Sequence, residues 1–230
     1  MNAFDVNDCL TRYRRLMARR PDSFVNPSGD IYEILTDEAG IARAQRDAAA
    51  ARRQLGMSGE DTRVGVLADD PYLLLLRDAV RFADGTFGLY NRVMVPSGAA
   101  VLPVMDGRII LIDRFRHGTR QWHLEAPRGS LSGTAPPIDD ARRELSEEIG
   151  AEAGEVIDLG LYHATTGCLD EAHHLFLGRI ARVGALDRHE AIRGLRTLPV
   201  HEAEALAADG TITDGPTLAL LLRARLRGLL

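Results

Sequence analysis

Hydrophobic and polar positions alternate with a helical period at the start of the chain. Leu10, Tyr13 and Met17 recur at helical spacing among charged residues. The pattern ends before Pro21, because proline disfavours the helical conformation in the residue that precedes it. A second helical pattern, rich in alanine, runs from about residue 37 to residue 55. The pattern therefore predicts two helices before the first strand.

From residue 73 the apolar runs become short and strand-like. Asp84-Gly85 is a hairpin signal between two such runs, so an antiparallel hairpin is expected over 73–95. Further strands are expected at 99–105, 108–113 and 122–125, followed by a loop rich in proline and glycine up to residue 137. Trp122 is expected to lie in the core rather than to stack on a base.

The C-terminal part mixes helical and strand-like patterns. Ile138, Ala141, Leu145 and Ile149 form one apolar stripe of a helix, and Gly150 is a suitable C-terminal stop. Further strands are expected at 156–162, 174–180 and 195–198, with closing helices at 200–208 and 216–229. A mixed, mostly antiparallel sheet with a few helices predicts an α+β fold or an α/β sandwich.

Composition narrows the classes of partner. The 230 residues carry a net charge of −5 with both signs interspersed, so a nucleic-acid polymer is not expected as a partner. Cys9 and Cys168 are far apart and form no CxxC pair, which favours free thiols in a reducing cytoplasm over disulfides or a structural zinc site. The apolar runs are too short to span a bilayer, and no export signal is expected at the start.

The predicted helix at 138–149 carries a cluster of acids. Glu144 and Glu148 lie about 40° apart in helical projection, with Glu147 beside them. Like charges this close destabilise an isolated helix, so they need either solvent screening, as on a solvated acidic face, or a cation. The preceding loop would bring backbone carbonyls near them, and Mg²⁺ prefers such oxygen ligands while keeping waters that a phosphate can replace. This combination favours phosphate chemistry.

The segment around these acids, Gly129–Ala151, reads GSLSGTAPPIDDARRELSEEIGA and resembles the Nudix box. That pattern is a glycine, five residues, a glutamate, seven residues and then R-E-U-x-E-E-x-G-U, with U a bulky apolar residue. The positions in register are Gly129, Arg143, Glu144, Leu145, Glu147, Glu148 and Gly150. Two positions depart: Ala135 replaces the first glutamate, which is not the main metal ligand in the family, and Ala151 is smaller than usual.

The resemblance extends from about residue 73 onward to ADP-ribose pyrophosphatases and related nucleotide-sugar hydrolases. It implies a Nudix-type α/β/α sandwich with a mixed sheet over 96–230. Residues 1–72, which precede the resemblance, are expected from their own pattern to form a helical extension. Residues 73–95 would form a β-hairpin that packs across a homodimer.

The same resemblance implies roles for the residues of the box. Glu144 and Glu148 would be the main ligands of Mg²⁺ or Mn²⁺, with Glu147 as a further ligand or a base. The backbone carbonyl of Arg128 would complete the ligand set, and Arg143 would orient the glutamates. The reaction would be metal-dependent hydrolysis of a pyrophosphate bond.

Residues outside the helix are also implicated by the resemblance. Glu125, Arg128 and Gly129 belong to a stretch similar to a motif of these hydrolases and are expected to bind substrate. Three more residues each have two interpretations. Arg116 is either a substrate contact or an exposed arginine at a strand end, and Glu171 is either a substrate contact or a turn residue. Glu190 is either an additional catalytic carboxylate or a solvated loop acid. The pair His173-His174 is not expected to bind zinc, since neighbours on a strand point to opposite faces.

The expected substrate is a small nucleoside diphosphate derivative, with ADP-ribose, split into AMP and ribose 5-phosphate, as the best single candidate. GDP-mannose or another nucleotide sugar is the nearest alternative, because Thr166 stands where the ADP-ribose group usually has a proline. A non-catalytic Nudix module that binds a nucleotide is the alternative from another class.

Overall fold

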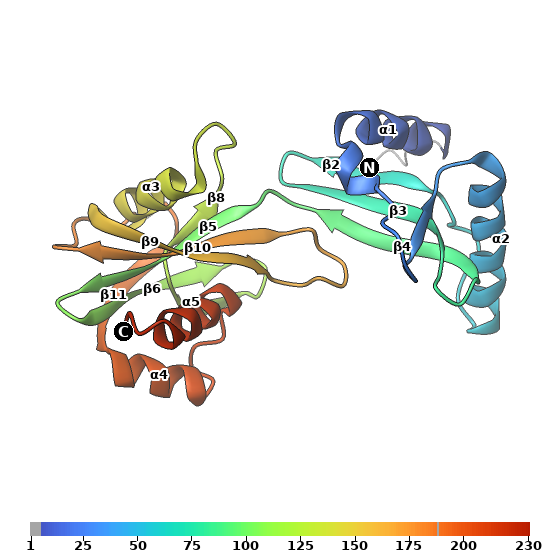
Figure 1. Ribbon diagram of the computed structural model, residues 1–230. Helices are drawn as coiled ribbons and strands as arrows, with labels where there is room; N and C mark the ends of the chain where they lie inside the picture. Colours follow the sequence, from blue (N-terminus) through green and yellow to red (C-terminus); the bar gives the residue numbers. More distant parts are fainter. Residues whose placement is uncertain (1–5, 188) are drawn as a thin grey trace. The chain divides into compact units, whose positions relative to one another are not determined.

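The computed structural model describes residues 6–187 and 189–230, and the chain folds into two units (Figure 1). The first unit holds the described residues up to Val95 together with Gly167–Asp170. The second unit holds Pro96–Thr166 and Glu171–Leu230. Within the described ranges, no helix combines the length and the apolar character needed to cross a membrane.

The first unit is a four-stranded antiparallel sheet with helices packed on it. Its central strand β3 (Leu73–Arg81) pairs with β4 (Phe87–Met94) along its length, with β2 (Gly65–Asp70) at its start and with β1 (Glu33–Leu35) at its end. The helical elements are α1 (Val6–Arg19), the short 3₁₀ helix η1 (Pro21–Phe24) and α2 (Glu38–Gln54). The predicted hairpin over 73–95 is confirmed, with Gly85 at a positive φ of 83° in its turn.

The first 72 residues are not wholly helical, contrary to the expectation from the sequence. Strands β1 and β2 lie there, and both pair with β3. β1 has only three residues and β2 ends in Asp69 and Asp70, so neither shows a strong local strand pattern. Such strands draw their stability from the partner strand rather than from intrinsic propensity.

The second unit is an α/β/α sandwich, which confirms the predicted fold class. Its seven strands are β5 (Gly98–Met105), β6 (Arg108–Arg116), β7 (Gln121–Glu125), β8 (Arg128–Ser130), β9 (Ala153–His163), β10 (Ala172–Ile180) and β11 (Ile192–Pro199). The sheet is mixed, because β5 and β10 are parallel and the other pairs are antiparallel. Helix α3 (Pro137–Ile149) covers one face, and α4 (Val200–Ala208) and α5 (Gly215–Leu226) lie on the other (Figure 1).

The central strand β5 is buried on both faces, which explains its continuous apolar sequence. Ala99 and Val101 pack into the cluster beneath α3, whereas Ala100 and Leu102 pack into the cluster beneath α4 and α5. Side chains of a strand point alternately to its two faces, so one strand serves both core layers.

Strands β5 and β6 pair only next to their turn and then separate. β8 pairs with β5 through Ala99 and Gly129, and β7 pairs with β6. The expected loop up to residue 137 therefore contains a short strand, β8, which the proline and glycine signals had hidden. Two further expectations were wrong in detail: Trp122 is 42% exposed rather than a core residue, and the last helix ends at Leu226.

Candidate active site

Two glutamates of helix α3 are buried beside the hydrophobic core. Ala141, Leu145 and Ile149 are fully buried against the sheet, which fixes the rotation of the helix. Glu144 and Glu148 follow one turn apart and are 6% and 2% exposed. Gly150 then ends the helix in the left-handed conformation, with a φ of 59°.

Strand β8 approaches the first of these acids so closely that only glycine fits. A Cβ atom on Gly129 would collide with all three carboxylate atoms of Glu144. The backbone N–H of the preceding residue, Arg128, donates a hydrogen bond of 3.2 Å to Glu148 Oε2. The two carboxylates of α3 therefore lie against the backbone of β8.

Arg143 holds the first group of acids together. Its Nη2 lies 2.7 Å from Glu144 Oε1 and its Nη1 donates to Glu147 Oε2 at 2.6 Å. It also donates to Asp140 Oδ1 at 3.1 Å and to the backbone carbonyl of Ser130 at 2.9 Å. The arginine thus ties three acids of α3 to β8. Glu147 itself points outward, with its side chain 53% exposed.

Arg114, on β6, holds a second group that the sequence analysis did not predict. Its guanidinium donates to Glu148 and to Glu190, and its Nη1 lies 3.4 Å from the backbone carbonyl of Arg128. The alternation Arg114-Phe115-Arg116 places both arginines on one face of the strand. That signal could have pointed to Arg114 as well as to Arg116.

Burial dominates the electrostatics of both buried glutamates. Burial raises the pKa of Glu148, the charge of Arg114 lowers it, and the charge of Glu144 raises it, so that the resulting pKa is about 7. Burial also raises the pKa of Glu144, against the opposing effect of Arg143. Either carboxylate is therefore costly to ionise without a nearby cation.

A second arginine cluster lies beside the first. Arg116 donates to Glu125 at 3.1 Å, and Glu125 is fully buried. Arg128 donates to Asp214 Oδ1 at 2.8 Å, and its Nη2 lies 3.6 Å from Glu125 Oε2. Asp214 also caps α5 by accepting from the backbone N–H of Thr217 at 3.0 Å. Arg116 is half-buried against Glu125 rather than fully exposed at the strand end, and Asp214 is a member that the sequence analysis missed.

Glu171 pairs with a neighbouring histidine on β10. Its Oε1 lies 3.0 Å from His173 Nε2, and this hydrogen bond lowers the pKa of Glu171. The charges of Arg128 and Asp214 also act on Glu171. The His173 ring packs on the backbone of Gly98, where a Cβ atom would lie 2.5 Å from Nδ1. The structure therefore brings Glu171 toward the Arg128 cluster.

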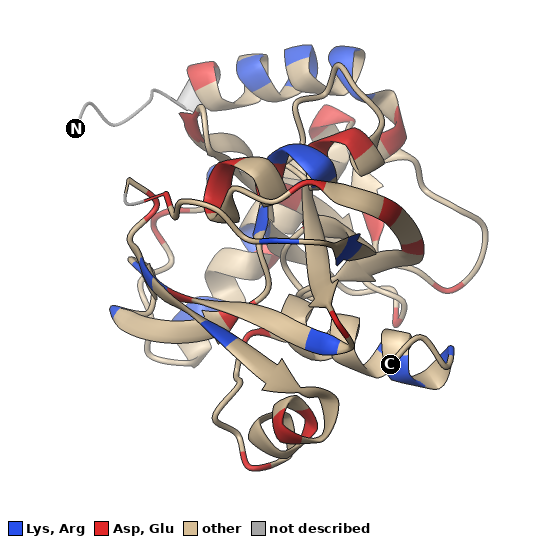
Figure 2. Ribbon diagram, turned by 90° about the vertical axis from the view of Figure 1, so that its left-hand side faces the viewer, with Lys and Arg blue, Asp and Glu red and all other residues tan. Residues whose placement is uncertain are grey.

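The acids converge on arginines rather than on one another. In the ranges 6–187 and 189–230, no group of three or more His, Cys, Asp or Glu side chains is arranged to hold a metal ion. The oxygen donors nevertheless suit a hard divalent cation: Glu144 and Glu148 are buried carboxylates, and the Arg128 carbonyl faces a cationic group. These residues fit such an ion if the ion replaces an arginine, Arg114 or Arg143, as the positive charge beside the carboxylates. Figure 2 shows acidic and basic residues spread over helices, strands and loops.

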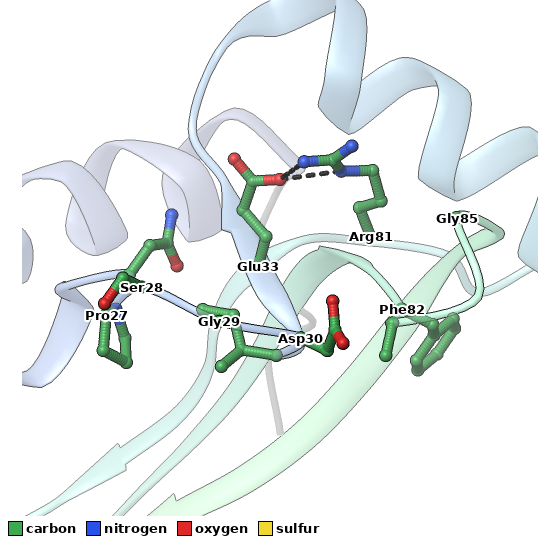
Figure 3. Close-up of a pocket in the computed structure, with 11 residues that line it drawn as sticks. Pro27, Ser28, Gly29, Asp30, Glu33, Arg81, Phe82 and Gly85 are labelled. Atoms are coloured by element: carbon green, nitrogen blue, oxygen red, sulfur yellow. Dashed lines mark hydrogen bonds and ion pairs between the residues drawn. The ribbon is translucent and has the colours of Figure 1, made fainter.

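A separate cavity of about 350 Å³ belongs to the first unit (Figure 3). It is lined by the loop 26–31, by the hairpin turn and by the ion pair between Glu33 and Arg81. Both partners of that pair are partly exposed, and the loop residues are mostly exposed. None of the residues predicted to be catalytic lines it.

The chain is similar to several known proteins. The NUDIX domain family matches residues 94–221. A CMP-5'-(N-acetyl-N-hydroxy-3-aminopropyl)phosphonate hydrolase of Streptomyces rubellomurinus is 31% identical over 68% of this chain and 77% of its own. An ADP-ribose pyrophosphatase of Bacillus subtilis is 36% identical over 43% of this chain and 54% of its own. A GDP-mannose pyrophosphatase of Yersinia enterocolitica is 33% identical over 54% of this chain and 70% of its own.

One solved structure, an ADP compounds hydrolase, superposes with a TM-score of 0.63. It covers 71% of this chain and 91% of its own at 20% identity, which supports the fold alone. The matched residues 94–221 include α3 and all the acids and arginines of both clusters. The chain therefore belongs to the Nudix domain family, and its enzyme class is that of a Nudix pyrophosphohydrolase.

Proposed function

We propose that the chain hydrolyses the pyrophosphate bond of a nucleoside diphosphate derivative in a reaction that depends on Mg²⁺ or Mn²⁺. ADP-ribose, split into AMP and ribose 5-phosphate, is the first candidate substrate. The names of two relatives, an ADP-ribose pyrophosphatase and a GDP-mannose pyrophosphatase, support a nucleotide sugar. GDP-mannose is therefore the second candidate.

The close approach of Glu144 and Glu148 to the backbone of β8 carries the proposal. Two buried carboxylates and the Arg128 carbonyl form a set of hard oxygen donors, and these residues would hold the divalent cation. When bound, such an ion lowers the pKa of a water molecule and neutralises phosphate oxygens. Arg143 keeps Glu144 in place by contacting both the acid and the carbonyl of Ser130. Glu147, which Arg143 also holds, serves as a further ligand or as a base.

The second cluster supplies groups that can bind the substrate. Arg116 and Arg128 present guanidinium groups, which suit phosphate oxygens. Arg128 Nε is buried without a hydrogen-bond partner among the described residues, so a substrate oxygen that reaches it would satisfy this donor. Glu125 holds both arginines, and Glu171 lies within reach of the charge of Arg128. Glu190, tied to the site through Arg114, serves as the additional catalytic carboxylate.

A substrate panel with Mg²⁺ tests the proposal. ADP-ribose, GDP-mannose and other nucleotide sugars are incubated with the full chain, and release of AMP, GMP or another nucleoside monophosphate is measured. We expect ADP-ribose to be hydrolysed with the highest kcat/KM. Inertness toward every compound, together with tight nucleotide binding by calorimetry, would instead favour the non-catalytic binding module.

A CMP-linked phosphonate belongs in the same panel. The relative that covers 68% of this chain is a hydrolase of such a compound, and this is the specific observation in its favour. Release of CMP in preference to AMP or GMP would move the assignment to that substrate class.

We also propose that the chain is a homodimer that associates through the hairpin of β3 and β4. The exposed side chains of Tyr72 and Leu73 at its start, 79% and 40% exposed, support an apolar contact there. Light scattering at several concentrations tests the stoichiometry, and a monomer at all of them would refute it. The cytoplasmic location, the boundary between an extension and the hairpin, and the role of the hairpin in dimerisation stay predictions.

A further inference from the structure

Arg114 connects several segments of the second unit. It is 8% exposed, and its guanidinium contacts two carboxylates from different elements, Glu148 of α3 and Glu190 of the loop before β11. The same group lies 3.4 Å from the backbone carbonyl of Arg128 on β8. One arginine therefore joins three other segments of the second unit, 14, 34 and 76 residues away in the sequence.

The oxygen atoms around Arg114 include those proposed to bind the divalent cation. Glu148 and the Arg128 carbonyl are members of that donor set, and Glu190 lies at its edge. A guanidinium keeps its positive charge at any pH a protein tolerates. A divalent cation and the guanidinium of Arg114 cannot both occupy the space between the same oxygens, because like charges repel and each oxygen offers few lone pairs.

We propose that Arg114 is an internal counter-cation that occupies the metal site in the metal-free protein and sets its affinity for divalent ions. It compensates the buried charge of Glu148 until an ion arrives, and it then gives up that contact. This inference rests on the proposed metal-dependent function. Arg114 acts through the glutamates and is a positioning residue.

The proposal predicts the effect of removing the guanidinium. A metal ion that must displace an internal competitor can bind only those molecules in which the competitor has left the site. Its apparent affinity is the intrinsic affinity multiplied by that fraction. Arg114→Gln removes the competitor and leaves Glu148 and Glu190 without their cation. We expect Mn²⁺ to bind Arg114→Gln about five-fold or more tightly than the wild type, since the competent fraction rises.

Isothermal titration of the substrate-free, full-length protein with MnCl₂ measures this affinity, in alkaline buffer so that Glu148 is ionised in both proteins. Arg193→Gln is the matched control, because Arg193 also pairs with a carboxylate, Asp113, at 2.7 Å but does not contact the acids of the site. Its affinity for Mn²⁺ should equal that of the wild type.

Thermal unfolding gives a second readout that needs no activity. Metal-free Arg114→Gln should melt below the wild type, and MnCl₂ should raise its Tm by more than it raises that of the wild type, because binding to the folded state stabilises it. Arg114→Lys, which keeps the charge but lacks the planar fork of donors that holds both carboxylates at once, should lie between the two proteins. It also serves as the test variant if Arg114→Gln does not fold.

The outcomes separate this inference from the proposed function. Equal or weaker Mn²⁺ binding by Arg114→Gln, with clear binding by the wild type, overturns the counter-cation and leaves the metal-dependent function standing. A higher KM for the nucleotide with unchanged Mn²⁺ affinity would assign Arg114 to the substrate and also overturns it. Failure of every variant and of the wild type to bind Mn²⁺ overturns both proposals.

Discussion

The two units each bury an acid beside an arginine, but they surround it differently. In the first unit Asp78 is 2% exposed, accepts from Tyr13 and accepts from Arg92 Nε at 2.6 Å. Arg92 also donates to the carbonyl of Ser23 at 2.8 Å, so the network closes on itself. Burial and Asp78 together raise the pKa of Tyr13, which keeps the phenol as a donor.

Glu148 in the second unit is equally buried, at 2% exposed, yet it lies one helical turn from a second buried acid. Its pKa rises to about 7, mainly through burial, and the neighbouring charge of Glu144 contributes to the rise. Its arginine partner is shared with Glu190. Equal burial therefore serves two purposes: one acid is held in a complete hydrogen-bonded network, and the other is kept in an electrostatically unfavourable position that a divalent cation would relieve.

Replacing Glu148 tests the functional side of this comparison. Glu148→Gln keeps the shape but removes the charge, so turnover should fall by more than about 100-fold, the upper range for losing a residue that merely supports a ligand. The fold should persist, which circular dichroism can verify. The measurement is the rate of nucleoside monophosphate release at saturating substrate and Mg²⁺.

The control for this variant is Glu155→Gln, an exposed acid paired with Arg179 at 3.1 Å. Its rate should match that of the wild type. Near-normal hydrolysis by Glu148→Gln would remove this residue from the proposed ligand set.

Asp78 should show the opposite profile. Asp78→Ala leaves the partly buried Arg92 without its carboxylate partner, and removing one member of a buried ion pair costs about 3–5 kcal/mol of unfolding free energy. Urea unfolding of the full chain measures the loss. Glu33→Gln, which breaks the more exposed pair with Arg81, should cost less than about 1 kcal/mol. Similar losses for the two variants would show that the Asp78 network is not structural.

The acids of α3 could be predicted because they depend on one helix. Their spacing and the apolar stripe of Leu145 and Ile149 are local features, and a helix converts them directly into positions in space. The glycine at residue 129 could be placed only through the resemblance. Its physical reason, contact with Glu144, requires the pairing of β8 with β5.

The partners of Arg114 and Asp214 could not be found in the same way. Arg114 meets Glu148 and Glu190 across 34 and 76 residues of sequence, and Asp214 meets Arg128 across 86 residues. Such contacts are set by the order of strands in the sheet, which local periodicity does not encode. For the same reason the three-residue strands β1 and β8 escaped prediction while the long periodic helices did not.

The pH dependence of stability offers a third test, of intermediate size. The carboxyl of a glutamate ordinarily has a pKa of 4.5, and that of Glu148 in the folded protein is about 7. Between these values the folded protein holds more protons than the unfolded chain, so this group's contribution to stability falls as the pH rises from about 4.5 to about 7. The slope is at most about 1.4 kcal/mol per pH unit.

Urea unfolding of the wild type and Glu148→Gln across this range, without divalent cations, isolates the effect of one group. The stability difference between the two proteins should grow in favour of Glu148→Gln as the pH rises, and it should level off above about 7. A difference that does not change with pH would mean that Glu148 is not held at an unfavourable position.

The smallest expected loss of stability comes from replacing a glycine, and each unit offers one for comparison. A Cβ atom on Gly129 would strike the carboxylate of Glu144, and one on Gly88 would lie 2.6 Å from the ring of Phe82. Both substitutions by alanine overpack the protein and should cost about 1–3 kcal/mol of unfolding free energy. Only Gly129→Ala displaces a proposed metal ligand, so only this variant should also weaken Mn²⁺ binding and slow hydrolysis. Gly88→Ala could instead lower the rate per folded molecule as much as Gly129→Ala does. Steric strain in either unit would then be enough to slow hydrolysis, and the close contact of β8 with Glu144 would have no special role in catalysis.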